Sequence, residues 1–153
     1  MVIRPIEEQD RQQWEPLWKG YLDFYEVTLS SAQSDLTWER FFDPSHVFQA
    51  VVAQIDGSIV GIAHAMLRQS TWEAVGDLYI EDLFVAPSAR GQGVARGLIE
   101  RFREQALAQG VGSLYWQTRA GNLKAQALYD QIATKNDYIQ YAIKISKLAE
   151  QKK

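Results

Sequence analysis

The chain has 153 residues, of which 46% are hydrophobic and 23% charged, a composition typical of one soluble globular domain with a sizeable core. Its formal net charge of −3 argues against a nucleic-acid partner. The absence of cysteine excludes a disulfide framework, a thiolate zinc site and a cysteine nucleophile. The N-terminus lacks the apolar core of a signal peptide and no apolar run reaches membrane-spanning length, so we expect a cytoplasmic protein without a membrane partner.

The first quarter of the chain predicts one strand and two helices. A short strand is expected over residues 2–6 and a helix over 8–26. A second short helix, capped by Ser34 or Asp35, is expected to run to Phe42. Apolar and aromatic side chains recur at spacings of three and four along the first helix and are expected to face the core: Trp14, Leu17, Trp18, Tyr21, Leu22 and Tyr25.

The middle of the chain predicts an antiparallel hairpin and a third strand. Two β-rich runs, 47–55 and 58–67, are joined by Asp56-Gly57, a strong hairpin signal. A turn over 73–76 then leads into a buried strand that ends at Val85.

The last part of the chain predicts alternating helices and strands. An amphipathic helix over 94–109 is stopped by Gly110, and a strand over 113–118 follows. A helix over 122–132 and a last strand over 138–145 complete the pattern.

The element order is therefore β-α-α-β-β-β-α-β-α-β, which is mixed α/β (α+β). It predicts a central, twisted, mixed but mostly antiparallel sheet with helices on both faces. We expect residues 1–148 to form a single domain and residues 149–153 to form a charged tail.

A glycine-rich turn, Arg90-Gly-Gln-Gly-Val-Ala95, separates the strand ending at Val85 from the helix over 94–109. A helix start leaves unpaired N–H groups at the positive end of the dipole. Gly91 and Gly93 have no Cβ, so a phosphate could approach the backbone, and Arg90 could add a forked contact. The alternative is a tight turn with no ligand. The motifs of P-loops and of dinucleotide-binding folds are both absent.

Three blocks in this order resemble the GCN5-related N-acetyltransferase (GNAT) family along nearly the full chain. The glycine-rich turn matches the Arg/Gln-x-x-Gly-x-Gly/Ala signature that holds the pyrophosphate of acetyl-CoA in that family. Tyr79-Ile-Glu-Asp-Leu-Phe-Val85 looks like the corresponding strand of polyamine acetyltransferases. The third block looks like the Hpa2-like branch, which acts on histones, polyamines and amino acids; it comprises Leu114-Tyr-Trp-Gln-Thr118, Asn122, Ala125-Gln126 and Leu128-Tyr129.

The resemblance implies acetyl-CoA as cosubstrate and no metal. It places the pantetheine along the strand ending at Val85, as a pseudo-strand bound by the main chain of Phe84 and Val85. The N–H of Val85 would face the thioester oxygen, as in an oxyanion hole. Asn122 would contact the cofactor, and its alternative role is a helix N-cap. The implied cofactor-binding residues are Phe84, Val85, Arg90, Gly91, Gln92, Gly93, Val94, Ala95, Asn122 and Tyr129.

Tyr129 and Glu81 are the expected catalytic residues. A phenol has a pKa of about 10 and a thiol of about 8.5, so Tyr129 could protonate the leaving sulfur; the alternative is a core tyrosine. A primary amine has a pKa of about 10.4 and must lose a proton, and the family's matching glutamate makes Glu81 the base. Adjacent strand residues point to opposite faces, so Asp82 is expected to be structural. The alternative for Glu81 is an ion pair at a strand end.

The acceptor pocket is less defined by the sequence. Tyr25, Glu26, Trp38 and Trp116 could line it, because aromatic walls and an acidic residue suit a cationic amine, but a plain core is the alternative. His46 and His64 lack the spacing of a metal site or a nucleophilic triad and are expected to be surface or satisfied histidines.

One segment departs from the family pattern. Family members often have a glycine and an aromatic after the helix tyrosine, where this chain has Ala133 and a longer turn to Tyr138. The departure leaves the geometry of the last strand open.

We therefore expect an N-acetyltransferase that transfers the acetyl group of acetyl-CoA to a small primary amine by direct attack on the thioester. Polyamines come first as acceptors, then amino acids or a lysine side chain. The alternatives are a protein or peptide acetyltransferase and a non-catalytic acetyl-CoA-binding or interaction domain. By analogy with related enzymes, the last strand could also form the interface of a homodimer.

Overall fold

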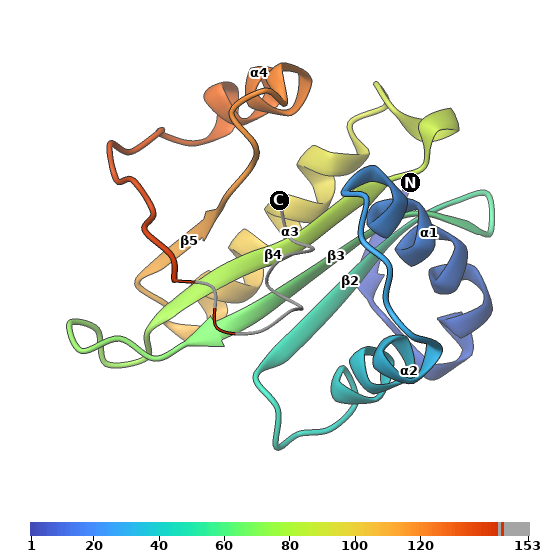
Figure 1. The fold of residues 1–153 in the computed structure, drawn as a ribbon, viewed down its shortest axis with the longest axis horizontal. Helices are drawn as coiled ribbons and strands as arrows, with labels where there is room; N and C mark the ends of the chain where they lie inside the picture. The colour runs from blue at the N-terminus through green and yellow to red at the C-terminus, as the bar shows by residue number, and fades with distance from the viewer. Residues whose placement is uncertain (144, 146–153) are drawn as a thin grey trace. The chain divides into compact units, whose positions relative to one another are not determined.

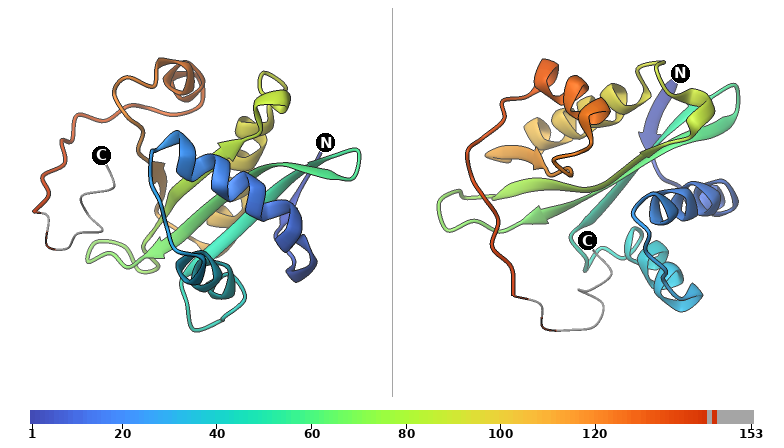
Figure 2. Two further views of the ribbon diagram at one scale, coloured as in Figure 1. Left: turned by 45° about the vertical axis from the view of Figure 1, so that its right-hand side comes forward. Right: turned by 45° about the horizontal axis from the view of Figure 1, so that its top comes forward.

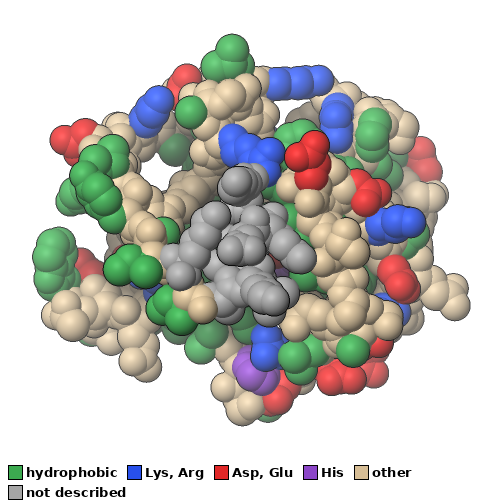
Figure 3. All heavy atoms as spheres, in the orientation of Figure 1, with side chains coloured by type: hydrophobic (Ala, Val, Ile, Leu, Met, Phe, Trp, Pro, Cys, Tyr) green, Lys and Arg blue, Asp and Glu red, His purple; other side chains and the backbone are tan. Residues whose placement is uncertain are grey.

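The structure is a computed structural model that describes residues 1–143 and 145. The chain divides into two compact units, Met1–Trp116 and Gln117–Lys153. The tail predicted over 149–153 and position 144 of the predicted last strand lie outside the described residues. In the described part of the chain, no helix combines the length and hydropathy needed to cross a membrane. Acidic and basic side chains are interspersed on the face shown in Figure 3.

The first unit is built on a five-stranded sheet in which neighbouring strands follow the chain order (Figure 1). The first four strands pair antiparallel and the fifth lies parallel to the fourth, so the predicted mixed, mostly antiparallel sheet is confirmed. The strands are β1 (Val2–Pro5), β2 (Phe48–Ile55), β3 (Ser58–Arg68), β4 (Asp77–Val85) and β5 (Ser113–Trp116). The predicted hairpin turn joins β2 to β3, with φ of 48° at Asp56 and 82° at Gly57.

Helices cover both faces of this sheet within the first unit (Figure 2). On one face, a short 3₁₀ turn, η1 (Glu8–Asp10), precedes α1 (Arg11–Phe24), and α2 (Ser31–Arg40) follows. Trp14 and Trp18 of α1 are buried in a core cluster with Ile62 and Phe84, and Tyr21 packs against it. On the other face lies α3 (Val94–Gln109), preceded by the 3₁₀ turn η2 (Pro87–Ala89). A Cβ added at Gly61 would meet Val94 of α3 at 2.7 Å, which shows how closely this helix packs.

The bounds of α3 are those that the sequence predicts, because both ends carry strong signals. Gly93 and Gly110 flank the helix in left-handed conformations, with φ of 79° and 69°. The apolar stripe between them is buried: Val94, Leu98, Ile99, Phe102 and Ala106.

Most boundaries in the first unit lie within three residues of the prediction, and two differ by more. Helix α2 begins at Ser31, not after Ser34 or Asp35, because the Ser30 hydroxyl accepts a hydrogen bond from the Gln33 N–H at 3.2 Å and caps the helix earlier. The loop before β4 spans residues 69–76, longer than the turn predicted over 73–76. It ends at Gly76, whose φ of +105° and tight packing leave no room for a Cβ, which would lie 2.1 Å from the Arg68 carbonyl oxygen.

The second unit contains α4 (Leu123–Ile132), and its described residues after α4 form no helix or strand. The strand predicted over 138–145 is wrong for the described residues, since 138–143 and 145 form no strand. The odd-numbered side chains Ile139, Tyr141, Ile143 and Ile145 alternate with other residues along this segment, yet they are 74–93% exposed. Alternation favours a strand, but it does not supply a neighbouring strand with which to pair.

Candidate active site

Strands β4 and β5 are paired over only half the length of β4. Asp77 to Ile80 pair with Ser113 to Trp116, and β4 then continues to Val85 paired with β3 alone. The Ala86 N–H donates to the Val60 carbonyl of β3 at 2.8 Å. Successive N–H groups alternate between the two edges of a strand, so the N–H of Val85 points to the edge that β5 leaves open. This is the geometry expected for a main-chain contact with pantetheine.

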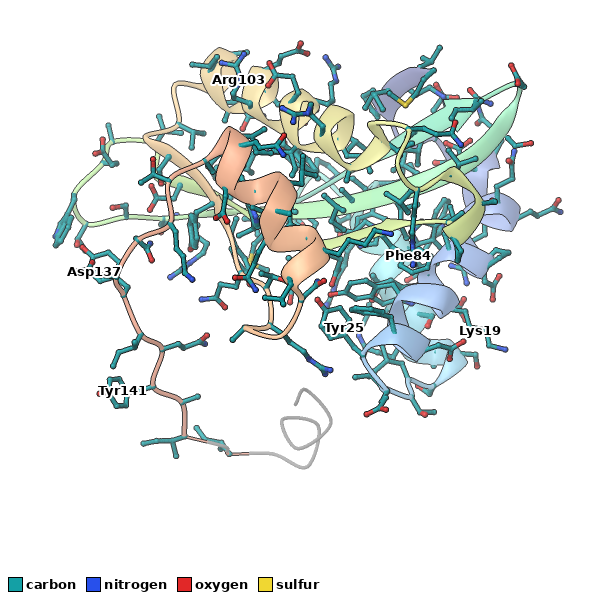
Figure 4. All side chains as sticks on the ribbon, turned by 90° about the horizontal axis from the view of Figure 1, so that it is seen from above. Lys19, Tyr25, Phe84, Arg103, Asp137 and Tyr141 are labelled. Atoms are coloured by element: carbon teal, nitrogen blue, oxygen red, sulfur yellow. The ribbon has the colours of Figure 1, made fainter. Side chains whose placement is uncertain are left out.

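The same alternation revises the contribution of Phe84. Its N–H points toward β3, so the open edge offers Leu83 and Val85 rather than Phe84 and Val85 as main-chain partners. The Phe84 side chain is 9% exposed and belongs to the core cluster, in close contact with α1: a Cβ added at Gly20 would lie 2.8 Å from its ring (Figure 4).

A β-bulge in β4 lies where β5 ends its pairing. The register pairs Ala65 with Ile80 and His64 with Asp82, so Glu81 is the extra residue. Strict alternation stops at a bulge, so the argument that Glu81 and Asp82 must point to opposite faces does not apply to this backbone. Such bulges redirect side chains and occur often next to active sites.

Tyr21 of α1 lies beside both carboxylates. Its hydroxyl approaches the Glu81 carbonyl oxygen at 3.4 Å. Burial raises the pKa of Tyr21 above its ordinary value, and the negative charge of Asp82, a hydrogen bond with its carboxylate and the nearby Tyr25 and Glu81 act in the same direction. The rings of Tyr21 and Tyr25 are 4.9 Å apart, with Tyr25 at the end of α1 (Figure 4). The Tyr21 and Tyr25 phenols thus lie close enough to the bulge to feel the charges of Asp82 and Glu81.

The turn before α3 fits a phosphate. Gly91 and Gly93 have φ of +80° and +79°, and a Cβ built on either would have nothing within 4 Å. No described side chain caps the N-terminus of α3, so the N–H groups of its first turn remain available to an anion. These features fit the pyrophosphate of acetyl-CoA. Arg90 is exposed, and its Nε donates to the Val85 carbonyl at 3.2 Å, which links the turn to the end of β4.

In the second unit, Asn122 occupies the N-cap position of α4 without capping it. Its Nδ2 donates to the Thr118 hydroxyl at 3.1 Å instead, so the side-chain cap considered from the sequence does not form. Gln126 Nε2 donates to the Ala120 carbonyl at 2.8 Å and holds the preceding loop on the helix. Tyr129 is half-buried, and α4 contains no fully buried residue. Its helix therefore gives little support to the reading of Tyr129 as an ordinary core tyrosine.

The four residues predicted to line the acceptor pocket have different surroundings. Trp38 packs against the aromatic core, with its ring 5.0 Å from that of Trp14. This is the core position that the sequence left open as the alternative. Glu26 is exposed and has a left-handed φ of 57°. Trp116 is the last residue of β5, opposite Ile80 in the register. Tyr25 is the one that lies near the carboxylates, through Tyr21.

The sequence alone did not indicate that side chains of α1 and β3 contribute to this site. The sequence predicts Tyr21 as core, Asp82 as structural and His64 as a surface or satisfied histidine, without linking them to one another. The structure joins all three, because His64 and Asp82 are cross-strand partners. Only the register between β3 and β4 could have shown this, and that register depends on the long 69–76 loop and on the bulge. His46 is a surface residue 3.7 Å from Asp43.

Comparisons with known proteins agree with this geometry. Residues 14–133 match the model of the acetyltransferase (GNAT) family. The D-amino-acid N-acetyltransferase HPA3 of Saccharomyces cerevisiae is 33% identical over 143 residues, covering 92% of this chain and 89% of that protein. A thialysine N-epsilon-acetyltransferase of Caenorhabditis elegans is 39% identical over 71 residues, covering 46% of this chain and 41% of the relative.

Among solved structures, an aminoglycoside N-acetyltransferase in complex with CoA superimposes with a TM-score of 0.74 at 20% identity, covering 95% of this chain and all of that one. This likeness shows a shared fold. Together with the family match over most of the chain, it leads to one assignment. The chain belongs to the GNAT acetyltransferase family and is an acetyl-CoA-dependent N-acetyltransferase.

Proposed function

We propose that this enzyme acetylates the primary amine of a small, amino acid-like molecule, with polyamines as the second acceptor class. The observation that supports a cationic amine as acceptor is the pair of carboxylates, Glu81 and Asp82, at the β4 bulge near Tyr21 and Tyr25. The order of the acceptor classes rests on the names of two relatives. Two adjacent negative charges with aromatic neighbours suit a cationic acceptor. They also suit an acceptor with a second ammonium group, which one carboxylate could hold while the other accepts a proton.

The chain's own residues divide the work of amide formation. Acetyl-CoA supplies an acetyl group activated as a thioester. The open N–H groups of the α3 N-terminus, with Gly91 and Gly93, hold its pyrophosphate. Glu81 removes a proton from the acceptor ammonium, because only the free amine is nucleophilic. The N–H of Val85 donates to the carbonyl oxygen as negative charge develops there. The free amine attacks the thioester carbon, the C–S bond breaks, and Tyr129 donates its proton to the departing sulfur. The second proton that the new amide nitrogen loses restores the neutral phenol of Tyr129.

The names of two relatives favour amino acid-like acceptors over polyamines. The yeast relative is named for D-amino acids and the nematode relative for thialysine. Both names describe a small amine that also carries a carboxylate. The sequence alone put polyamines first, and we reverse that order here.

An acceptor panel tests the proposal. Purified protein is mixed with acetyl-CoA and D-lysine, L-lysine, thialysine, spermidine or a lysine-containing peptide, and free CoA thiol is measured. The chain has no cysteine, so the protein adds no background to a thiol reagent. We expect the highest kcat/KM with an amino acid. Preference for the peptide would support a protein acetyltransferase, and acetyl-CoA binding without turnover would support a non-catalytic domain.

A further inference from the structure

His64 is a buried polar side chain in the core between α1 and the sheet. It is 2% exposed and lies on β3, directly opposite Asp82 of β4. The rings of Trp18 and Phe41 lie 5.5 and 4.6 Å from the imidazole. A buried polar group in such apolar surroundings is destabilising unless its hydrogen-bonding atoms are paired.

Both ring nitrogens of His64 are paired, and the partners determine the tautomer. The Trp14 indole nitrogen lies 3.0 Å from Nε2 of His64. An indole N–H can only donate, so Nε2 must be the acceptor. The ring hydrogen is therefore on Nδ1, where it faces the Asp82 Oδ2 at 3.0 Å. His64 consequently donates to Asp82, and Trp14 determines the direction of that hydrogen bond.

The Asp82 carboxylate follows the bulge residue Glu81, and its side chain is 13% exposed. It accepts the hydrogen bond from His64 at one oxygen, Oδ2. The Tyr21 hydroxyl from α1 donates to the Glu81 carbonyl at 3.4 Å and so lies at the same bulge. A carboxylate can accept several hydrogen bonds, so the bond from His64 orients Asp82 and leaves it able to accept one from an ammonium group.

We propose that His64 is a positioning residue of the acceptor site, which holds the Asp82 carboxylate beside Glu81 so that it binds the ammonium group of the acceptor. The inference rests on the proposed function, because it takes the bulge as the place where the amine binds. Asp82 then contributes acceptor binding and Glu81 removes the proton. The Trp14–His64 contact acts indirectly, because it determines which nitrogen of His64 carries the hydrogen.

Two substitutions of His64 separate the two contacts. In His64→Asn, the amide nitrogen can take the place of Nδ1 and still donate to Asp82. In His64→Gln, the longer amide reaches toward the position of Nε2, where its oxygen can accept from Trp14, and the donor to Asp82 is lost. Both variants introduce an amide in place of the ring, so they control for the loss of its volume. Thermal melts on both report how much stability each substitution costs.

The kinetic expectation follows from the loss of a hydrogen bond to a charged group. We expect His64→Gln to lower kcat/KM for the amine by about 10- to 100-fold, mainly through a higher KM for the amine, with the KM for acetyl-CoA unchanged. We expect His64→Asn to remain within a few-fold of wild type. Equal losses in the two variants, or wild-type kinetics in His64→Gln, would overturn the positioning role. A wild-type protein that acetylates no amine would instead refute the proposed function.

The tautomer can be measured in the wild-type protein without activity. The chain has two histidines, so His46→Gln assigns the ring signals of His64 in two-bond ¹H–¹⁵N spectra. We expect a protonated Nδ1 and an unprotonated Nε2 at His64. Asp82→Asn keeps an acceptor oxygen for His64 but removes the charge, so it should retain the tautomer and raise the KM for the amine. A hydrogen on Nε2 in the wild type would overturn the arrangement, whatever the kinetics.

Discussion

The segment from β4 to α3 forms the elements that its sequence predicts, whereas in the segment from α4 onward the predicted helix forms but the run after it forms no strand in the described residues. In the first, glycines with positive φ flank a helix with a buried stripe, and β4 pairs with strands on both sides. In the second, α4 has no fully buried residue, and the alternating run that follows is exposed. A local pattern therefore determines structure where a neighbouring element supplies the partner it needs. Each segment carries one predicted catalytic side chain, Glu81 and Tyr129, and substitutions can compare them.

The largest effect is expected in the second segment. Tyr129→Phe removes one hydroxyl and almost no volume. General acid catalysis typically contributes ~10²–10⁴-fold, so kcat should fall within that range. Acetyl-CoA affinity should change by less than about 10-fold, because one neutral hydrogen bond is worth ~0.5–1.5 kcal/mol net. Steady-state kinetics beside a thermal melt measure both. A lower Tm with kcat intact would show that Tyr129 is structural.

The second test concerns the turn before α3. Gly93→Asp places a carboxylate where the pyrophosphate is expected, and like charges ~4 Å apart near a protein surface repel by about 4 kcal/mol. We expect acetyl-CoA affinity, measured by calorimetry, to fall by at least about 100-fold. Gly57→Asp is the matched control, because Gly57 has a φ of +82° and equally open surroundings in the β2–β3 turn. Equal affinity in the two variants would refute the phosphate assignment.

The third test concerns the base. Glu81→Gln keeps the shape of the side chain and removes the proton acceptor. We expect kcat/KM for the amine to fall about 10- to 100-fold at pH 7. The deficit should shrink toward pH 10, because the acceptor amine, with a pKa near ~10.4, then loses its proton without help. If the pH–rate profile of the variant matches that of the wild type, the base is water or Asp82 and not Glu81.

The difference between the two segments also explains how much of the fold and of the site could be predicted from the sequence. The glycine-rich turn and both ends of α3 were predictable, because each depends on residues within a few positions. The start of α2 was missed because three serines compete for the cap and only the structure selects Ser30. The bulge at Glu81 was not predictable from one chain, since an extra residue in β4 is defined only against β3. The network of His64 with Asp82 depends on that register and was missed with it.

A smaller effect is expected from the buried ion pair of the first unit. Asp10 is 3% exposed and accepts hydrogen bonds from Arg4 at 2.6 and 2.8 Å and from the Glu7 N–H at 2.8 Å. The hydrogen bond with Arg4 lowers the pKa of Asp10 below its ordinary value, although burial acts in the opposite direction. Its contribution to stability is therefore complete above the unfolded-state pKa of about 3.9 and is lost as the pH falls through the lower, folded-state pKa.

We expect Asp10→Asn to lower the free energy of unfolding by about 1–3 kcal/mol at pH 7 and to weaken its dependence on pH below about 4. Asp35→Asn is the control, because Asp35 forms an exposed ion pair with Arg11 and should change stability by less than about 1 kcal/mol. All the tryptophans lie in residues 1–116, so their fluorescence reports on the first unit alone. Similar losses in the two variants would contradict the assigned role of the buried pair.

The smallest effect is expected in the C-terminal segment, where the sequence predicts a strand and the structure shows exposed side chains. Analogy with related enzymes suggests a homodimer interface at the same segment. Ile143 is 90% exposed, and a substitution at an exposed site typically changes stability by less than about 0.5 kcal/mol. We therefore expect Ile143→Lys to leave the melting temperature and kcat unchanged. Ile62→Ala, at a β3 position that is 1% exposed, is the comparison and should cost about 2–5 kcal/mol. Sedimentation of wild type and Ile143→Lys over a range of concentrations completes the test. A drop in the melting temperature of Ile143→Lys would show that the segment is packed as the predicted strand, and a dimer lost on substitution would show that a second copy of the chain covers it.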